Sequence, residues 1–311
     1  MKSKGKKRTG KVHKKQALVL YSMMVPGILY LLINNYIPML GLSIAFKKYD
    51  YSKGIFGSEW VGLKNFTYLF KSQDAFIITR NTICYNLAFI ILGTTLAVVV
   101  AIMLNELKSA MSKKVYQTLI LIPYLISMVV VSYIVYAFLS ADSGFINNTI
   151  LKAFGIKRIS WYTTPKYWPF ILVFVHLWKS FGYNSIIYYA TVIGIDSSLY
   201  EAAVVDGATR LQRIFHVTLP GLKSTIITMV LLSIGKIFYS DFGLFYQVPM
   251  DSGLLSNVTQ TIDTYVYKGL TQLNDVGRAS AAGFYQSIVG FIVVLTANMI
   301  VRKLDKDNAL F

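Results

Sequence analysis

Long apolar blocks alternate with shorter polar segments along most of the chain. Each block reaches the roughly 20 residues that an α-helix needs to cross the hydrocarbon core of a bilayer. Pro123 interrupts the third block, where a kink or break is expected. The pattern predicts six membrane-spanning helices, at about residues 17–46, 82–104, 115–139, 167–190, 222–247 and 280–301.

Composition agrees with a membrane protein. Of the 311 residues, 55% are hydrophobic and only 14% are charged, whereas a soluble chain carries about a quarter of charged residues. Mean hydropathy is +0.52. We therefore expect an all-α integral membrane protein with a basic tail (1–16), one six-helix transmembrane domain (17–301) and a second tail (302–311). The first block is too long for a cleaved signal peptide and is kept as an uncleaved helix.

Charge sets the expected orientation. The net charge of +17 lies largely in the N-terminal tail and in short loops. Six spans put both termini on one side, together with the loop at 105–114 and the polar stretch 196–220. These short segments are denser in Lys and Arg than the longer loops, which predicts that they are cytoplasmic. The basic tail is expected to touch anionic membrane lipid, and no pattern favours nucleic acid.

The polar stretch 196–220 lies between the fourth and fifth blocks. Ser198 to Glu201 has the pattern of a capping box that opens a short helix, and Asp206-Gly207 ends that helix. Thr209 to Gln212 repeats the capping pattern, and Leu211, Ile214 and Phe215 then fall on one face. Pro220 marks the expected start of the next helix. Two short helices around a glycine bend, with an apolar face outside the membrane, predict a module that docks another protein.

The same stretch resembles a known motif. Glu201-Ala202-Ala203, then Asp206-Gly207-Ala208, and finally Leu219-Pro220 are similar to the EAA loop of importer-type ABC transporter permeases. Leu199-Tyr200, Asn81-Thr82, Thr261 to Tyr267 and Gly277 to Ala281 resemble the carbohydrate-uptake branch. The resemblance covers nearly the whole chain beyond the first basic tail.

The resemblance implies a type I importer permease in a bacterial plasma membrane. It implies a second homologous permease, two cytosolic ATPase subunits and an extracytoplasmic solute-binding protein as partners, with an oligosaccharide as substrate. It assigns contact with the ATPase to Glu201 and the bend between the coupling helices to Gly207. ATP and Mg would be bound by the partner ATPase, since this chain has no G-x-x-x-x-G-K-S/T sequence.

Two lysines stand within apolar blocks, where a charge faces a cavity or a partner by default. Lys179 shares a helical face with His176, Ser180 and Tyr183, with Asn184 beside them. Around the second, Ser233, Lys236 and Ser240 share a face. In relatives of the maltose type, sugar contacts come from the two helices that flank the motif. These eight residues are therefore the predicted substrate pathway.

Two interpretations of the lysines are open at this stage. They could pair with Asp241 or with carboxylates of a partner permease, and the serines could bond backbone carbonyls. If instead the lysines line the pathway, their charges suit an anionic solute, such as a uronate-containing oligosaccharide.

Other functions are weighed against this one. They are an ABC permease for polyamine, phosphate or peptide, and a secondary transporter or channel that needs no ATPase. A membrane enzyme is disfavoured, because no nucleophile–base pair and no group of metal ligands is evident: the three histidines are scattered.

Overall fold

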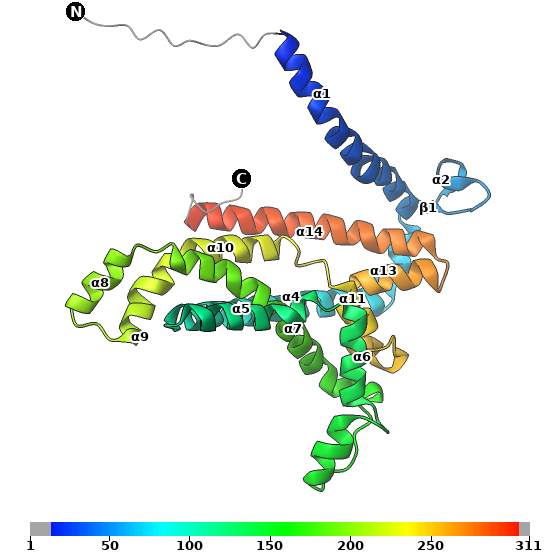
Figure 1. Ribbon diagram of the computed structural model, residues 1–311. Helices are drawn as coiled ribbons and strands as arrows, with labels where there is room; N and C mark the ends of the chain where they lie inside the picture. The colour runs from blue at the N-terminus through cyan, green and yellow to red at the C-terminus, as the bar shows by residue number, and fades with distance from the viewer. Residues whose placement is uncertain (1–13, 305–311) are drawn as a thin grey trace, which may run out of the picture.

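The computed structural model describes residues 14–304 (Figure 1). Their regular elements are helices and one antiparallel pair of two-residue strands, joined by loops. The predicted tails, 1–16 and 302–311, fall largely outside the described residues. Helix α1 already begins at Lys14.

The N-terminal half contains three of the predicted spans and a small hairpin. Strand β1 pairs antiparallel with β2, with Lys47 opposite Trp60. The elements are α1 (Lys14–Leu31), η1 (Leu32–Tyr36), η2 (Ile37–Phe46), β1 (Lys47–Lys48), α2 (Gly54–Gly57), β2 (Glu59–Trp60), α3 (Lys64–Lys71), α4 (Asp74–Glu106), α5 (Ala110–Leu125) and α6 (Met128–Leu139).

The C-terminal half carries the remaining spans and the polar stretch between them. Its elements are η3 (Ile146–Leu151), η4 (Trp161–Thr163), η5 (Pro165–Tyr167), α7 (Trp168–Ile193), α8 (Ser197–Val205), α9 (Arg210–Arg213), η6 (Ile214–Thr218), α10 (Leu219–Ile234), α11 (Phe242–Gln247), η7 (Gly253–Leu255), α12 (Ser256–Thr259), α13 (Ile262–Thr271) and α14 (Val276–Leu304).

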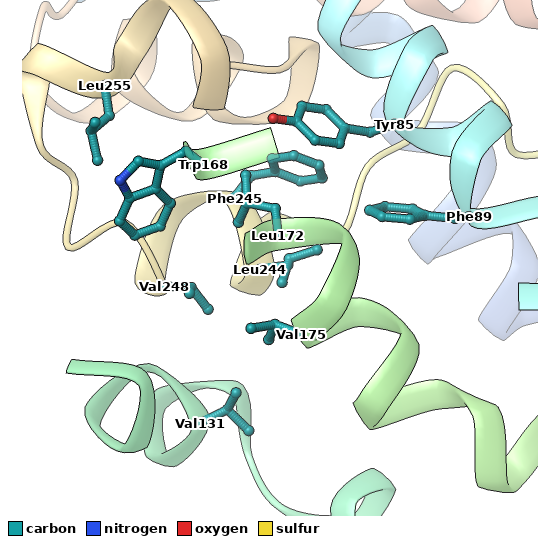
Figure 2. Close-up of a cluster of buried hydrophobic side chains, with 10 residues drawn as sticks. All are labelled: Tyr85, Phe89, Val131, Trp168, Leu172, Val175, Leu244, Phe245, Val248 and Leu255. Carbon is teal, nitrogen blue, oxygen red and sulfur yellow. The ribbon is translucent and has the colours of Figure 1, made fainter. Parts of the chain in front are cut away.

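The helices α4 and α7 form the centre of the bundle, and α5 and α10 pack beside them. Buried side chains from α4, α6, α7 and α11 meet around Trp168 and Phe245 (Figure 2). A Cβ atom added at Gly182 of α7 would lie 1.8 Å from the carbonyl oxygen of Ile120 in α5. Glycine at this position therefore allows the backbones of α5 and α7 to touch.

Helix α1 stands apart from this bundle (Figure 1). Its side chains from residue 19 to residue 31, and those of η1 after it, are exposed. An apolar helix without neighbours in its own chain is left to lipid or to another protein.

The number of spans agrees with the prediction, but two of them differ in shape. Five helices are long and apolar enough to cross a membrane, and α5 with α6 makes a sixth if that pair, bent by 93°, is one span. The break in the third block is thus confirmed. The predicted fifth span, 222–247, is wrong at both ends, because one continuous helix runs from Arg210 to Ile234 and the chain then leaves the helix.

The bundle has two distinct ends. Helices α8 and α9 lie at one end, and the hairpin and α13 lie at the other (Figure 1). The polar stretch 196–220 is therefore separated by the length of the helices from the loops at 47–64 and 272–275.

Candidate functional site

A polar cavity of about 340 Å³ opens between α4, α7 and the end of α10. Its walls are mixed, with Phe89, Tyr188 and Met229 among the apolar lining residues. The polar residues that line it are Asn86, Thr94, His176, Asn184, Ser233, Lys236, Ser240 and Asp241. A concave site with a few convergent polar groups is the usual form of a small-molecule site.

The floor of the cavity is a break between α10 and α11. Here the chain leaves the helix, and its carbonyl groups need new partners. The side-chain amide of Asn86 donates to the carbonyl oxygens of Ile237 and Tyr239, both at 2.9 Å. The amide of Gln286 in α14 donates to the carbonyl of Phe238 at 2.6 Å. Side chains from two other helices therefore hold the irregular segment in place.

A carboxylate completes this support. Asp263 in α13 accepts from the backbone N–H of Ser240 at 2.6 Å and from its hydroxyl at 2.8 Å. The same hydroxyl lies 2.7 Å from the hydroxyl of Thr261. Ser240 is thus engaged by its own chain, and its contribution to the cavity is mainly shape.

Lys236 and Asp241 face the cavity at either end of the irregular segment. Asp241 caps α11 by accepting from the N–H of Leu244 at 3.1 Å. The ammonium of Lys236 makes no hydrogen bond or ion pair within residues 14–304. Lys236 therefore brings to the cavity a positive charge that no described residue engages, beside the Asp241 carboxylate that caps α11.

The α7 side of the cavity is formed by His176 and Asn184. The imidazole of His176 stacks on the ring of Phe89, with ring centroids 3.7 Å apart and an interplanar angle of 11°. Five of the eight predicted pathway residues come together in this cavity: His176, Asn184, Ser233, Lys236 and Ser240. The predicted helical face that joins the last three is wrong, because α10 ends at Ile234.

Lys179 lies elsewhere. Its ammonium donates to the carbonyl oxygens of Pro123 at 3.4 Å and Tyr124 at 2.9 Å, and also to that of Ile126. These carbonyls stand at the bend between α5 and α6. Lys179 therefore has a structural role, but with backbone carbonyls in place of the carboxylates considered for it, and it does not line this cavity.

Tyr183 and Ser180 also lie outside the lining of this cavity. The ring of Tyr183 stacks on Tyr124, with centroids 4.5 Å apart. The hydroxyl of Ser180 donates to the carbonyl of His176 in its own helix at 2.7 Å. Tyr183 and Lys179 thus serve the contact between α5 and α7, whereas the Ser180 hydroxyl bonds only within α7.

Sequence reasoning missed the α4 side of the site. Asn86, Thr94 and the small Gly93 line the cavity from α4. The predicted pathway included only residues of the two helices next to the polar stretch. The signal was available: Asn86 is a polar amide inside an apolar block, and such residues turn inward by default.

The polar stretch 196–220 folds as two short helices around a glycine. At the end of α8, the N–H of Ala208 donates to the carbonyl of Ala203 at 2.9 Å, and the N–H of Gly207 to that of Val204 at 3.0 Å. This pair of bonds is a Schellman motif, which needs a left-handed residue. Gly207 provides it with a φ of +77°.

Of the two capping boxes predicted for these helices, the structure confirms one. Thr209 and Gln212 form the predicted capping box at the start of α9. The capping box predicted at Ser198 is wrong, because Asp196 caps α8 by accepting from the N–H of Ser198 at 2.9 Å. The backbone bond and the side-chain bond from Ser198 hold the pKa of the Asp196 carboxyl below its usual value.

The motif residues are spread over this module. Glu201, Ala202 and Asp206 are exposed on α8, and Ala203 is half-buried. Leu219 packs against the α4–α7 core, and Pro220 stands in the first turn of α10. The predicted start of a helix at Pro220 agrees with the start of α10 at Leu219, although α10 follows α9 and the wider turn η6 without an intervening loop.

The module exposes apolar side chains on both short helices. The solvent-exposed fraction is 87% for Val205, 67% for Leu211 and 61% for Phe215. The hydroxyls of Tyr200 in α8 and Thr218 in η6 lie 3.0 Å apart and join the two arms. The module is thus internally braced, and its apolar side chains are left for a partner.

Known proteins share this architecture. Residues 90–306 match the family model of the binding-protein-dependent transport system inner membrane component. Protein LplB of Bacillus subtilis (strain 168) is 36% identical over 290 residues, which are 93% of this chain and 90% of that protein. The polygalacturonan/rhamnogalacturonan transport system permease protein YteP of the same strain is 34% identical over 293 residues, 94% of this chain and 90% of that protein.

Two solved structures are similar along nearly the whole chain. One is a bacterial ABC transporter involved in the import of the acidic polysaccharide alginate, with a TM-score of 0.85, 32% identity, and coverage of 94% of this chain and 97% of that one. The other is a bacterial alginate ABC transporter in complex with an alginate pentasaccharide-bound periplasmic protein, with the same TM-score and identity and coverage of 94% and 96%.

Proposed function

The chain belongs to the family of binding-protein-dependent transport system inner membrane components, and on that basis we propose that it passes an acidic oligosaccharide through the cavity beside Lys236. It is a multi-pass inner membrane permease of a sugar importer of the ABC class, and it is not itself an ATPase. This membership sets aside an ATPase-independent carrier. The sugar and polysaccharide transporters among the similar proteins argue against a non-sugar permease.

The unpaired ammonium of Lys236 is the observation that carries the proposal. Lys179 is committed to backbone carbonyls, so the argument from two lysines reduces to Lys236. Its ammonium reaches the cavity without a bond to any residue in 14–304, and an ammonium in such a place favours a carboxylate over a hydroxyl. A polygalacturonan permease and an alginate importer among the similar proteins support an anionic solute.

Transport assays test the choice of solute. The assembled importer is reconstituted in proteoliposomes and supplied with trigalacturonate or with neutral galactotriose. Loss of a charged hydrogen bond of about 1.5–3 kcal/mol predicts that Lys236→Met lowers uptake of trigalacturonate about tenfold or more. Uptake of a neutral sugar, where one is transported, should change little.

Lys152→Met is the matched control, because it removes one exposed positive charge from the loop that contains η3. Uptake restricted to neutral sugars, or uptake of trigalacturonate that is unchanged in Lys236→Met, contradicts the proposal.

The module at α8 and α9 is proposed to transmit ATP-driven motion from a cytosolic ATPase. Its exposed apolar side chains and its braced bend support this role. The proposal places both termini in the cytoplasm and includes two ATPase subunits, which bind ATP and Mg, a second permease and an extracytoplasmic binding protein. Glu201, Ala202, Ala203, Asp206, Gly207, Leu219 and Pro220 are the proposed coupling residues.

Co-purification with the ATPase tests the coupling module. Glu201→Lys reverses the charge of an exposed side chain on α8 and should abolish both co-purification and uptake. Glu106→Lys, an equally exposed change in the last turn of α4, should leave both intact. Retention of the ATPase by Glu201→Lys would remove Glu201 from the interface.

A further inference from the structure

A second polar recess lies at the end of the bundle opposite to α8 and α9. Its volume is about 350 Å³, within the range of small-molecule pockets. Three separate segments line it: residues 47–51 of the hairpin, residues 61–68 around the start of α3, and residues 273–278 at the start of α14. None of the predicted pathway residues is among them.

The walls of the recess are held in fixed positions. The side-chain amide of Asn65 in α3 donates to the carbonyls of Ala45 and Lys47, both at 3.0 Å. A Cβ atom at Gly277 would lie 2.9 Å from the amide nitrogen of Asn65, so α14 approaches this side chain closely. The ammonium of Lys47 donates to the carbonyl of Ile55 at 2.8 Å and fixes the hairpin loop. The concavity is therefore built by specific contacts across the three segments.

The charge of the recess is strongly positive. Lys47, Lys48, Lys64 and Arg278 line it, against the single carboxylate of Asp275. Asp275 is already shared between an ion pair with Arg278 at 2.8 Å and the N–H of that residue at 3.0 Å. The exposed ammonium groups of Lys48 and Lys64 form no ion pair with any residue in 14–304. Two free cations in one recess favour an anionic ligand.

Three tyrosines supply the remaining chemistry. Tyr49 and Tyr51 meet edge to face with ring centroids 5.0 Å apart, and the guanidinium of Arg278 lies 4.6 Å from the centre of the Tyr68 ring. Aromatic faces beside hydroxyl and ammonium groups suit the C–H faces and the hydroxyls of a sugar. An acyl chain would need a continuous apolar lining, and lysines, Arg278 and Asp275 interrupt the lining of this recess.

From this combination we propose that the recess is a second binding site for a carboxylated sugar, at the rim where solute arrives. The identity of the sugar class rests on the proposed function. The direction of arrival follows from the position of the recess, at the far end of the helices from the coupling module (Figure 1). A long acidic chain could then be held at the rim by Lys48 and Lys64 while its leading residues enter the cavity beside Lys236.

Binding of trigalacturonate to the assembled importer tests the proposal. The importer, without its binding protein, is placed in nanodiscs of neutral lipid and titrated calorimetrically. The double variant Lys48→Gln/Lys64→Gln should weaken binding about tenfold. The double variant Lys53→Gln/Lys71→Gln removes two nearby exposed lysines that do not line the recess, and it should bind as the unchanged protein does. Equal thermal stability of the two doubles verifies that both are folded.

The two sites are separated by repeating the titration in Lys236→Met. The loss caused by Lys48→Gln/Lys64→Gln should persist in that background. Binding that depends on Lys236 alone, or that is equal for the methyl ester of trigalacturonate, overturns the proposal. Uptake of trigalacturonate that is unchanged in Lys236→Met would refute the proposed function without affecting the proposal of the rim site. The two failures are therefore distinguishable.

A lipid headgroup is the competing source of negative charge. The titration is therefore repeated in nanodiscs that contain phosphatidylglycerol. Unchanged affinity for trigalacturonate supports the sugar site. Loss of that affinity, with lipid bound in its place through Lys48 and Lys64, overturns it.

Discussion

Lys179 and Lys236 both lie in apolar blocks of the sequence, but their ammonium groups have different surroundings in the fold. Lys179 stands in a membrane helix beside the break between α5 and α6, whereas Lys236 stands within the break that follows its own helix, α10. At the α5–α6 break, Lys179 donates to three carbonyl groups and is fully engaged. At the α10–α11 break, Asn86 and Gln286 bond the carbonyls, and Lys236 is left facing a cavity.

The difference shows that a charged side chain within a membrane protein can be accommodated in two ways. A lysine can satisfy backbone groups that a bent helix frees, and it then acts as structure. Where neutral side-chain amides donate to those carbonyls instead, the lysine remains available for a ligand. The identity of the donors around a break, and not the presence of a lysine, separates the two cases.

Lys179→Met should have the largest effect on this comparison. It removes the Lys179 donor from three carbonyls at the bend, of which that of Pro123 still accepts from the N–H of Ile126. Each acceptor left unpaired costs about 1–3 kcal/mol. We expect a loss of about 3 kcal/mol in stability and a melting temperature lower by roughly 5–10 °C, measured by thermal unfolding in detergent. Uptake of every sugar should fall with it. Lys179→Arg, which keeps donors at this position, should restore part of the stability; a Met variant as stable as the parent would refute the structural role.

Asn86→Leu should have the next largest effect. It removes the donor for the carbonyls of Ile237 and Tyr239 and loosens the floor of the cavity. A loss of about 2 kcal/mol is expected, along with lower uptake of all solutes, because the shape of the site changes as well as its charge. Thr95→Val is the control, since its hydroxyl bonds only the carbonyl of Ile91 in the same helix. A selective loss of acidic solutes alone would contradict this account.

Lys236→Met should leave stability nearly unchanged, within about 0.5 kcal/mol. Its ammonium has no bond to lose within residues 14–304, so only solute handling should respond. Parallel melting curves of Lys236→Met and Lys179→Met measure the comparison directly. A similar fall in both would show that the two lysines are alike after all.

Ser180→Ala and Ser233→Ala should have the smallest effects. Both hydroxyls donate to carbonyls four residues earlier in their own helices, at 2.7 and 2.8 Å, and those carbonyls lie within the helical hydrogen-bonding pattern. Changes within about 0.5 kcal/mol are expected, with uptake close to that of the parent. A marked loss of uptake in Ser233→Ala would make that hydroxyl a solute contact.

Local features of the chain were predictable because they depend on neighbours in sequence. The bend at Gly207 and the capping box at Thr209 follow from residues three or four apart, and both occur. The cap of α8 was misassigned by two residues, because the carboxylate of Asp196 accepts from the N–H of Ser198 and the helix begins at Ser197. Ser198 therefore already lies in the first turn of α8. The end of the fifth span was misplaced because apolar residues recur past Ile234, at Ile237-Phe238 and from Phe242 to Phe245. The break between them depends on partners from α4, α13 and α14.

The sequence by itself determined that this chain crosses a membrane about six times and presents a braced helix pair between two spans. Hydrophobic blocks and local caps are short-range signals, and they need no knowledge of distant residues. The tertiary structure decided which lysine faces the cavity. The carbonyls that engage Lys179 lie more than 50 residues away from it in sequence, and those that engage Asn86 lie more than 150 away. Such pairings form only when the helices pack, so packing engages one charge with backbone groups and leaves the other facing the cavity.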